Sequence, residues 1–262
     1  SPKGISMHAV RTGSGKPLLL VHGLGSSLRN WDPILPLLSA SRTVIAVDLP
    51  GFGESPPLNG EVTMASLTDA VQAFIEDEGL GDIDVVGSSM GARMVLEMAR
   101  RGHAGTTVAL DPGGFWSDGQ LKVFNASITA SVALVRSIQP ALPALTANAA
   151  GRTALLAQFS ARPWKLPADL VLTELRGFKT SVSLDEALSS LVHGPKQQGA
   201  PAGSLQGKVV IGWGCQDRVT LPSQARRATE LFPDARLHWF DHCGHFPHWD
   251  QPGPTAELIL AA

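Results

Sequence analysis

The feature that most constrains this chain is the sequence Gly-Ser-Ser-Met-Gly at residues 87–91. A short run rich in β-branched residues, 83–86, precedes it, and a helical pattern follows it. Glycines at both ends of such a motif let the chain turn sharply from a strand into a helix, so that the serine between them sits at the tip. This order predicts that Ser89 is an exposed nucleophile and that Gly87 and Gly91 support the turn.

Apolar runs bounded by turn residues predict strands that are buried on both faces. They alternate with helical patterns, which indicates an α/β fold with a mostly parallel sheet and helices on both of its faces. The predicted strands cover residues 4–13, 18–21, 43–47, 83–86, 106–110, 208–213 and 235–240. The predicted helices around them cover residues 28–39, 66–79, 90–101, 222–231 and 254–261.

The alternation stops between residues 113 and 193, where alanine, leucine and serine dominate at helical spacing. We therefore expect three or four helices inserted between two strands of the sheet, followed by a return linker rich in glycine, proline and glutamine. This predicts a core domain made of residues 1–112 and 208–262, with residues 113–207 as an inserted helical cap.

Composition excludes several classes of protein. Of the 262 residues 44% are hydrophobic, which is enough for a substantial core, and the net charge of −2 comes without a Lys/Arg-rich run. We therefore expect no nucleic-acid partner. No apolar run approaches the ~18 residues that a membrane span needs, and the first residues do not resemble a signal peptide. With only two cysteines, a cytoplasmic location is expected, while the oligomeric state stays open.

A serine hydroxyl becomes a nucleophile only when an oriented base removes its proton. The predicted turn therefore predicts two further residues later in the chain, first an acidic residue and then a histidine, each just after a strand. Asp217 follows the strand at 208–213, and His245 follows the strand at 235–240. Since the carboxyl ends of parallel strands share one edge, both side chains are expected beside Ser89.

Other residues compete for these two roles. His242 and His248 lie close to His245 in the sequence, but His245 is preferred because a glycine precedes it and a Phe-Pro pair follows it. Asp111 also follows a strand and competes with Asp217, which is preferred because of the chain order of acid and histidine.

A second glycine-containing loop, His-Gly-Leu-Gly, ends the strand at 18–21. Its small residues allow a substrate carbonyl to approach, so the backbone amides of Leu24 and Met90 are predicted to form an oxyanion hole. Gly23 and Gly25 would support this loop. The alternative is an ordinary strand-to-helix turn that His22 braces by hydrogen bonding.

Together these sequences resemble the α/β-hydrolase superfamily, in particular its serine-nucleophile, esterase-like members with a helical cap. The resemblance rests on residues 22–25, 48–55 (Asp-Leu-Pro-Gly-Phe-Gly-Glu-Ser), 87–91, Asp217 and 244–247. It implies Ser89 as nucleophile, His245 as base and then acid, and Asp217 as the group that orients the histidine. It also implies the Leu24 and Met90 amides as the oxyanion hole, a cap at 113–207, and no cofactor.

The predicted reaction is hydrolysis of a small to medium, hydrophobic carboxylic ester through an acyl-enzyme. The expected partner is a small ester-like molecule. Hydrolysis of a carbon–carbon bond in a diketone, lactone opening and perhydrolysis would use the same residues and stay open. A receptor-like, ligand-binding role stays open as well.

Further residues narrow the chemistry. The nucleophile position holds serine rather than aspartate, and the chain contains no tyrosine, which argues against dehalogenase and epoxide hydrolase reactions. No zinc-type ligand spacing or dinucleotide fingerprint is present, so no metal is expected, even at His242, His245 and His248, which lie close together in the sequence. Arg93 is expected in a structural ion pair. Cys215 and Cys243 are expected near each other as thiols rather than as a disulfide.

Overall fold

A computed structural model describes residues 6–262 and contains one seven-stranded sheet with the order β1-β3-β2-β4-β5-β6-β7. Only β1, at one edge, is antiparallel to its neighbour. The strands are β1 (Ala9–Thr12), β2 (Lys16–Val21), β3 (Arg42–Val47), β4 (Asp84–Ser88), β5 (Thr107–Leu110), β6 (Val209–Gly214) and β7 (Arg236–Phe240). The mostly parallel sheet is thus confirmed. Residues 4 and 5 of the first predicted strand lie outside the described residues.

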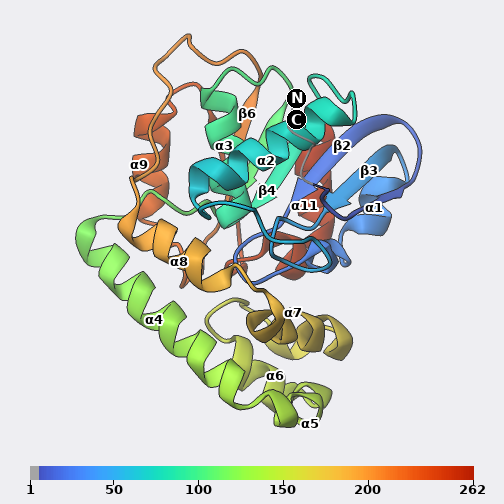
Figure 1. The fold of residues 1–262 in the computed structure, drawn as a ribbon, viewed down its shortest axis with the longest axis vertical. Coiled ribbons are helices and arrows are strands. Elements are labelled where there is room, and N and C mark those ends of the chain that lie inside the picture. Colours follow the sequence, from blue (N-terminus) through green and yellow to red (C-terminus); the bar gives the residue numbers. More distant parts are fainter. Residues whose placement is uncertain (1–5) are drawn as a thin grey trace.

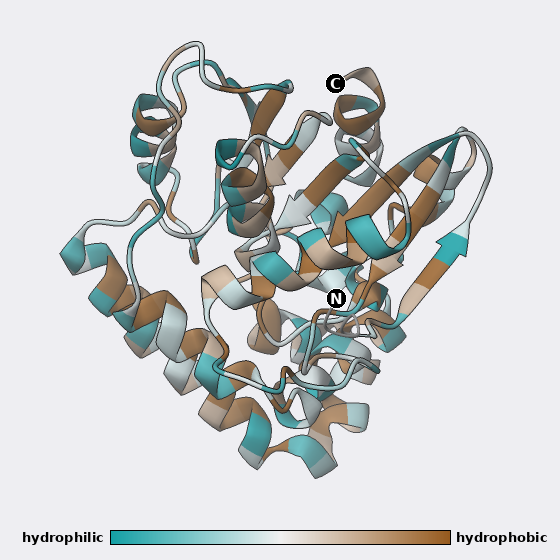
Figure 2. Cartoon of the chain, turned by 45° about the horizontal axis from the view of Figure 1, so that its top comes forward, coloured by the Kyte–Doolittle hydropathy of each residue, from teal (hydrophilic) through white to brown (hydrophobic). Residues whose placement is uncertain are grey.

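The central strands are apolar along their whole length because both faces of the sheet are covered. In β2, Leu18 and Leu20 belong to one hydrophobic cluster, whereas Leu19 and Val21 belong to a second cluster on the other face. Figure 2 shows these strands as hydrophobic segments enclosed by helices of mixed colour.

Helices cover both faces, as Figure 1 shows. On one face lie α2 (Met64–Asp77), α3 (Met90–Arg100) and α9 (Gln224–Leu231), whose buried residues join the larger cluster. On the other lie α1 (Leu35–Ser39) and α11 (Pro252–Ala261), which join the smaller cluster.

The segment between β5 and β6 (residues 113–207) is called the insert. Its helices pack as a group at one end of the molecule, and the stretch after the last helix runs back along the core to β6 (Figure 1). Its five α-helices exceed the three or four expected, because prolines at residues 140 and 143 start new helical segments rather than continue one. They are α4 (Asp118–Ser137), α5 (Leu142–Ala147), α6 (Ala149–Leu156), α7 (Ala168–Thr180) and α8 (Leu184–His193). Two 3₁₀-helices accompany them, η2 (Gln139–Ala141) and η3 (Pro163–Lys165).

Two local predictions differ from the structure. The single helix expected over 28–39 is divided into a 3₁₀-helix, η1 (Leu28–Trp31), and α1. Pro33 lies between them and lacks the amide hydrogen that a continuous helix needs. A short helix that the sequence pattern did not predict, α10 (Pro247–Asp250), follows the loop after β7.

The register of the parallel strands aligns their carboxyl ends. Val21 of β2 pairs with Gly87 of β4, and Leu110 of β5 pairs with Gly212 of β6. The loops that leave these strands therefore meet at one edge of the sheet, where a ligand site is expected in an open α/β fold.

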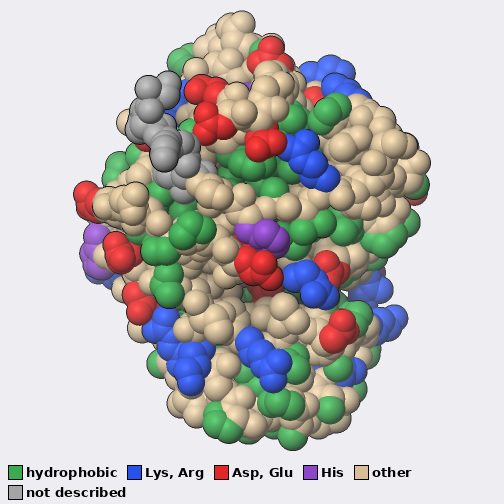
Figure 3. Space-filling model, turned by 45° about the vertical axis from the view of Figure 1, so that its right-hand side comes forward, with side chains coloured by type: hydrophobic (Ala, Val, Ile, Leu, Met, Phe, Trp, Pro, Cys, Tyr) green, Lys and Arg blue, Asp and Glu red, His purple; other side chains and the backbone are tan. Residues whose placement is uncertain are grey.

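The surface gives no single-sign charge region on the face in Figure 3, where Lys and Arg side chains lie among Asp and Glu side chains. Within residues 6–262, no individual helix has the length and hydropathy to cross a membrane. One bent pair, Asp118–Ser137 with Gln139–Ala147, meets the criterion by length and composition, with a bend of 68°.

Candidate active site

The chain turns sharply at Ser89, between β4 and α3. Ser89 has φ 56° and ψ −113°, a conformation that is strained for a residue with a side chain. The turn depends on its glycines: a Cβ on Gly87 would lie 2.2 Å from the Gly91 carbonyl oxygen, and a Cβ on Gly91 would lie 2.3 Å from that of Val21. The strand–serine–helix geometry thus follows the sequence prediction, and it leaves the Ser89 hydroxyl at the carboxyl edge.

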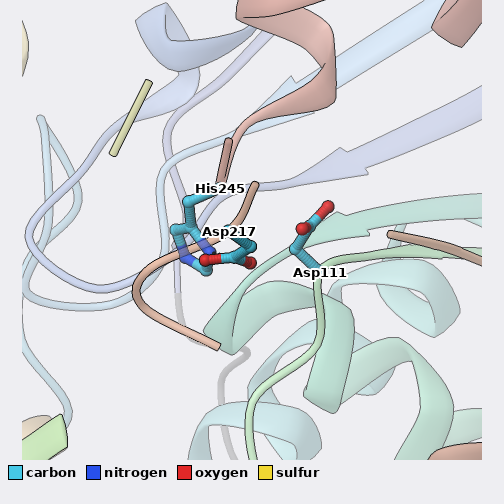
Figure 4. Close-up of side chains that lie close together, drawn as sticks. All are labelled: Asp111, Asp217 and His245. Carbon is cyan, nitrogen blue, oxygen red and sulfur yellow. Dashed lines mark hydrogen bonds and ion pairs between the residues drawn. The ribbon is translucent and has the colours of Figure 1, made fainter. Parts of the chain in front are cut away.

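His245 links Ser89 to Asp217. Its Nε2 lies 2.8 Å from Ser89 Oγ, and its Nδ1 lies 2.8 Å from Asp217 Oδ2. With the proton on Nδ1, the ring donates to the carboxylate and accepts from the serine hydroxyl. Figure 4 shows His245 beside Asp217. The structure therefore brings together three residues that are 128 and 28 positions apart in the chain.

Asp217 is buried and receives several hydrogen bonds besides the one from His245. The amides of Val219 and Thr220 donate to Oδ1 at 2.7 and 3.0 Å, and Thr220 Oγ1 donates to Oδ2 at 2.7 Å. Burial alone raises the pKa of this carboxyl. The charge of His245, the hydrogen bond from its ring and the hydrogen bond from Thr220 outweigh burial and hold the pKa below its usual value. Asp217 is thereby stabilised as the ionised partner of His245.

The loop that carries His245 is fixed by residues that the sequence analysis did not identify. The His245 amide donates to the Phe159 carbonyl of the insert at 2.9 Å. Asp250 accepts at 2.8 Å from the amides of both Gly244 and Ala161. The signal for Asp250 is weak in a sequence, since most of its partners lie in the insert. Thr220 was also not identified, although it has a clearer signal, because Asp-x-x-Thr is a typical side-chain-to-backbone turn.

The two competing histidines lie elsewhere. His242 is exposed at a turn with φ 51°. His248 is buried, hydrogen-bonds to Asn30 Oδ1 through Nε2 and packs against Trp31. Burial, together with the charge of His245, lowers the pKa of His248 to about 3. Neither histidine forms a hydrogen bond to Ser89.

Asp111, the competing acid, is also buried in this cluster at the end of β5. Its Oδ2 accepts from the Gly214 amide at 2.9 Å, but the group forms no hydrogen bond to His245. Burial and then the neighbouring charge of Asp217 raise the pKa of Asp111 well above its usual value. Within this structure Asp217, rather than Asp111, is the acid that contacts the histidine.

The loop after β2 lies against the turn at Ser89. A Cβ on Gly23 would come within 3.1 Å of Ser89 Cβ and 3.6 Å of the Met90 amide nitrogen. The backbone amides of Leu24 and Met90 donate no hydrogen bond to any group among the described residues. His22 braces the loop from below, since its Nδ1 lies 2.7 Å from the Gly23 carbonyl oxygen and its Nε2 accepts from the Leu49 amide at 3.0 Å.

Gly25 allows the insert to approach this loop. It has φ 70°, and a Cβ there would lie 2.9 Å from Leu184 Cδ1 and 3.2 Å from Phe178 Cδ1. Both side chains belong to insert helices, so the predicted supporting role of Gly25 is one of close packing.

A small cavity opens at Ser89 between the sheet edge and the insert. Besides Ser89 and His245, its one polar side chain is Ser26, and it has no lysine or arginine. It is lined by Gly23, Leu24, Ser26, Ser89, Phe124, Ile128, Val132, Phe159, Phe178, Leu184, Leu191, Val219, His245 and Phe246. Such a lining suits an apolar ligand with one reactive polar group.

Within residues 6–262, the single set of side chains close enough to share a metal ion is Asp111, Asp217 and His245. The oxygens of Asp217 already accept hydrogen bonds from Val219, Thr220 and His245. The hydrogen-bonding pattern therefore accounts for the cluster as an acid–base group.

Two smaller predictions can be compared with the structure. Cys215 and Cys243 are both free thiols, the first exposed and the second buried.

The ion pair expected for Arg93 is not formed among the described residues: this buried guanidinium donates instead to the Pro195 carbonyl at 2.5 Å. Burial lowers the pKa of Arg93 to about 10.

Comparison with known sequences gives relatives that include acetyltransferase components and hydrolases. The chain is 30% identical over 255 residues to a dihydrolipoyllysine-residue acetyltransferase component of an acetoin cleaving system from Pseudomonas putida, covering 94% of this chain and 63% of the relative. The counterpart from Cupriavidus necator is 28% identical, with coverage of 98% and 66%. This chain thus spans less than two thirds of these relatives. A 2-hydroxy-6-oxononadienedioate/2-hydroxy-6-oxononatrienedioate hydrolase from Pseudomonas putida is 24% identical, with coverage of 98% and 91%.

Comparison with solved structures supports the fold. An esterase from Thermogutta terrifontis superposes with a TM-score of 0.75 at 19% identity, covering 97% of this chain and 92% of the esterase. An enol-lactonase from Burkholderia xenovorans gives 0.74 at 18% identity, with coverage of 97% and 95%. The model of the alpha/beta hydrolase family matches residues 18–258, nearly the whole chain. Sheet order, sharp turn and family match agree, and this protein belongs to the alpha/beta hydrolase family.

Proposed function

We propose that this protein is a serine hydrolase that cleaves carboxylic esters with an apolar acyl group through an acyl-enzyme. The observation that carries the proposal is the continuous hydrogen-bonded path from Asp217 through His245 to the Ser89 hydroxyl. A strained, half-buried serine that donates to an oriented imidazole is the arrangement that nucleophilic acyl transfer requires.

In the first step His245 Nε2 takes the proton as Ser89 Oγ attacks the ester carbonyl carbon. The carbonyl oxygen gains negative charge, which the free amides of Leu24 and Met90 stabilise, and Met90 also begins helix α3. The imidazolium then protonates the leaving alcohol oxygen, and the acyl group stays on Ser89. Asp217 stabilises the imidazolium and holds the ring in its tautomer.

In the second step a water molecule replaces the alcohol. His245 removes its proton while the oxygen attacks the acyl carbon, and the carboxylic acid leaves as Ser89 regains its proton. We further propose that the insert acts as a cap domain on a core of residues 1–112 and 208–262, because its helices supply the apolar side of the cavity.

The cavity lining favours an acyl group without charge. Helices α4 and α8 contribute Phe124, Ile128 and Leu191, and the loops contribute Phe159 and Phe246. Burying an acyl chain against such side chains is favourable by roughly 0.8 kcal/mol per methylene group. A carboxylate there would lose its hydration without gaining a cation.

Carbon–carbon bond hydrolysis is the second candidate, since relatives from Pseudomonas putida and Dechloromonas aromatica are named for hydrolysis of 2-hydroxy-6-oxononadienedioate. That name describes a molecule with two carboxylates. The cavity of this chain offers no Lys or Arg to bind them. The lining therefore favours the neutral ester over a dicarboxylate.

The test is a panel of p-nitrophenyl esters with acyl chains of increasing length, beside a lactone and a vinylogous diketone with two carboxylates. We expect the highest kcat/KM for a neutral acyl ester, and no turnover by the Ser89→Ala variant. A diketone dicarboxylate turned over with a higher kcat/KM than every ester would overturn the substrate assignment. Turnover of no panel member, despite labelling of Ser89 by a fluorophosphonate, would favour a ligand-binding role.

A further inference from the structure

Two carboxyl groups share one buried cluster at the end of the sheet. Oxygens of Asp111 and Asp217 and a ring nitrogen of His245 all lie within 4.8 Å of one another. In Figure 4 Asp217 lies between His245 and Asp111. Both carboxyl groups are at most 3% exposed, and two carboxylates this close in a dry environment cannot both keep a full charge.

The donors around the two groups decide which one is ionised. Asp217 accepts from two amides, from the Thr220 hydroxyl and from His245. Asp111 accepts only from the Gly214 amide through Oδ2, and its Oδ1 has no hydrogen-bond partner among the described residues. A buried carboxylate oxygen without a donor is unfavourable, whereas a protonated oxygen can itself donate to a nearby charge.

The backbone conformation at Asp111 restricts which residues can occupy this position. Asp111 has φ 48°, a left-handed conformation that non-glycine residues adopt rarely, aspartate and asparagine more readily than most. The carbonyl oxygen of Asp111 lies 3.2 Å from Thr220 Oγ1, the hydroxyl that donates to Asp217, so one threonine contacts both residues. The Asp111 side chain is fully buried beside Asp217.

We propose that Asp111 is a positioning residue that retains its proton and donates it in a hydrogen bond to Asp217. The inference rests on the proposed role of Asp217 as the partner of His245. A neutral donor beside Asp217 shares the charge of that carboxylate. The carboxylate then attracts the imidazolium proton less strongly.

Other ionisable groups around Asp111 do not change this assignment. Asp250 and the buried Cys243 face the same cluster, and the remaining charged neighbours are Asp217 and His245. The carboxylate of Asp250 favours a neutral Asp111. Burial and the nearby carboxyl groups raise the pKa of Cys243 well above its usual value, so this thiol stays neutral and adds no charge.

The test uses two substitutions that the backbone tolerates. Asp111→Asn keeps a neutral donor and suits a positive φ, and Asp111→Gly removes the side chain at a φ that glycine adopts readily. Infrared spectroscopy at neutral pH detects the carbonyl stretch of a buried protonated carboxyl. Since Glu174 is also buried and protonates near neutrality, the spectra are recorded in a Glu174→Gln background.

We expect the Glu174→Gln protein to show the protonated-carboxyl band and the Asp111→Asn/Glu174→Gln protein to lack it. We also expect Asp111→Gly to move the acidic limb of the pH profile of kcat/KM upward by about 0.5–1 pH unit, because His245 becomes a stronger base. In Asp111→Asn, which keeps a neutral donor, the acidic limb should lie within about 0.3 pH unit of that of the wild type. The kcat/KM of this variant should fall less than about threefold.

A band unchanged by Asp111→Asn would overturn the proposal. So would a downward shift of the acidic limb in both variants, which is the sign expected if Asp111 carried a negative charge in the native protein. The infrared experiment needs no substrate. If the wild type cleaves no ester, the proposed function fails while the protonation of Asp111 is still decided.

Discussion

Two clusters that each supply a serine to the cavity lining contain the same three residue types, a serine, an acid and a histidine. In one, Asp217 and His245 lead to Ser89. In the other, Glu174 of α7 accepts from Ser26 Oγ at 2.9 Å and from Asn30 Nδ2 at 3.1 Å, and Asn30 in turn contacts His248.

The clusters differ in the donors around the acid. Asp217 receives a hydrogen bond from a histidine that can carry charge, and its pKa is lowered despite burial. Glu174 receives only neutral donors, and burial raises its pKa to about 7 in spite of them. We therefore expect a nucleophilic serine only where the histidine lies between the acid and the serine. In the Glu174 cluster the acid contacts the serine directly, and the histidine is too weak a base to help.

The largest expected difference is between the two serines. Ser89→Ala should lower kcat by about 10⁴-fold or more, because it removes the proposed nucleophile. Ser26→Ala should cost less than about tenfold, since it removes one hydrogen bond to Glu174. Ester hydrolysis by the two purified variants, with circular dichroism as a folding control, measures the contrast. Equal losses in both variants would contradict the distinction.

The two acids should differ almost as much. Asp217→Asn should reduce kcat by about 10⁴-fold, because the amide favours the wrong tautomer of His245. Glu174→Gln should leave kcat within about fivefold, since the amide still accepts from Ser26 or Asn30. Both substitutions preserve size, which makes them matched controls. Near-equal activities at the pH optimum would show that Asp217 does not act on His245.

The smallest expected effect is on stability. A pKa of about 7 in the folded state, against ~4.3 in the unfolded chain, means that Glu174 binds its proton more tightly when folded. Its contribution to the free energy of unfolding is thus complete below pH ~4.3 and is lost as the pH rises through 7, by about 4 kcal/mol in total.

Urea unfolding of the wild type and of Glu174→Gln between pH 4.5 and 8 checks this. We expect the stability of the wild type relative to the variant to fall across that interval and then level off. A difference that stays constant with pH would mean that Glu174 titrates as an ordinary glutamate.

Most residues of the Ser89 cluster could be predicted from the sequence, whereas few residues of the Glu174 cluster could. Ser89, Asp217 and His245 each follow a strand, so parallel register brings them to one edge whatever the rest of the chain does. Glu174 lies in the middle of an insert helix, where an acidic residue is usually exposed, and its partners are 144 and 148 residues away.

The division of the insert into helices was less predictable for a related reason. Helical spacing identifies an apolar side such as Phe124, Ile128 and Val132, but it does not say what covers that side. The same limit applied to His248, whose sequence neighbourhood resembles that of His245. Packing against Trp31 and Asn30, which are distant in the chain, decides that it is buried and neutral.

The most direct test of the account is to look for the acyl group on Ser89. The protein is mixed with a slowly hydrolysed activated ester, quenched in acid and analysed by intact mass and peptide mapping. The account predicts one acyl adduct per chain, located on Ser89, that is absent from Ser89→Ala. Ester turnover with no adduct on Ser89, or with full activity retained by Ser89→Ala, would contradict it.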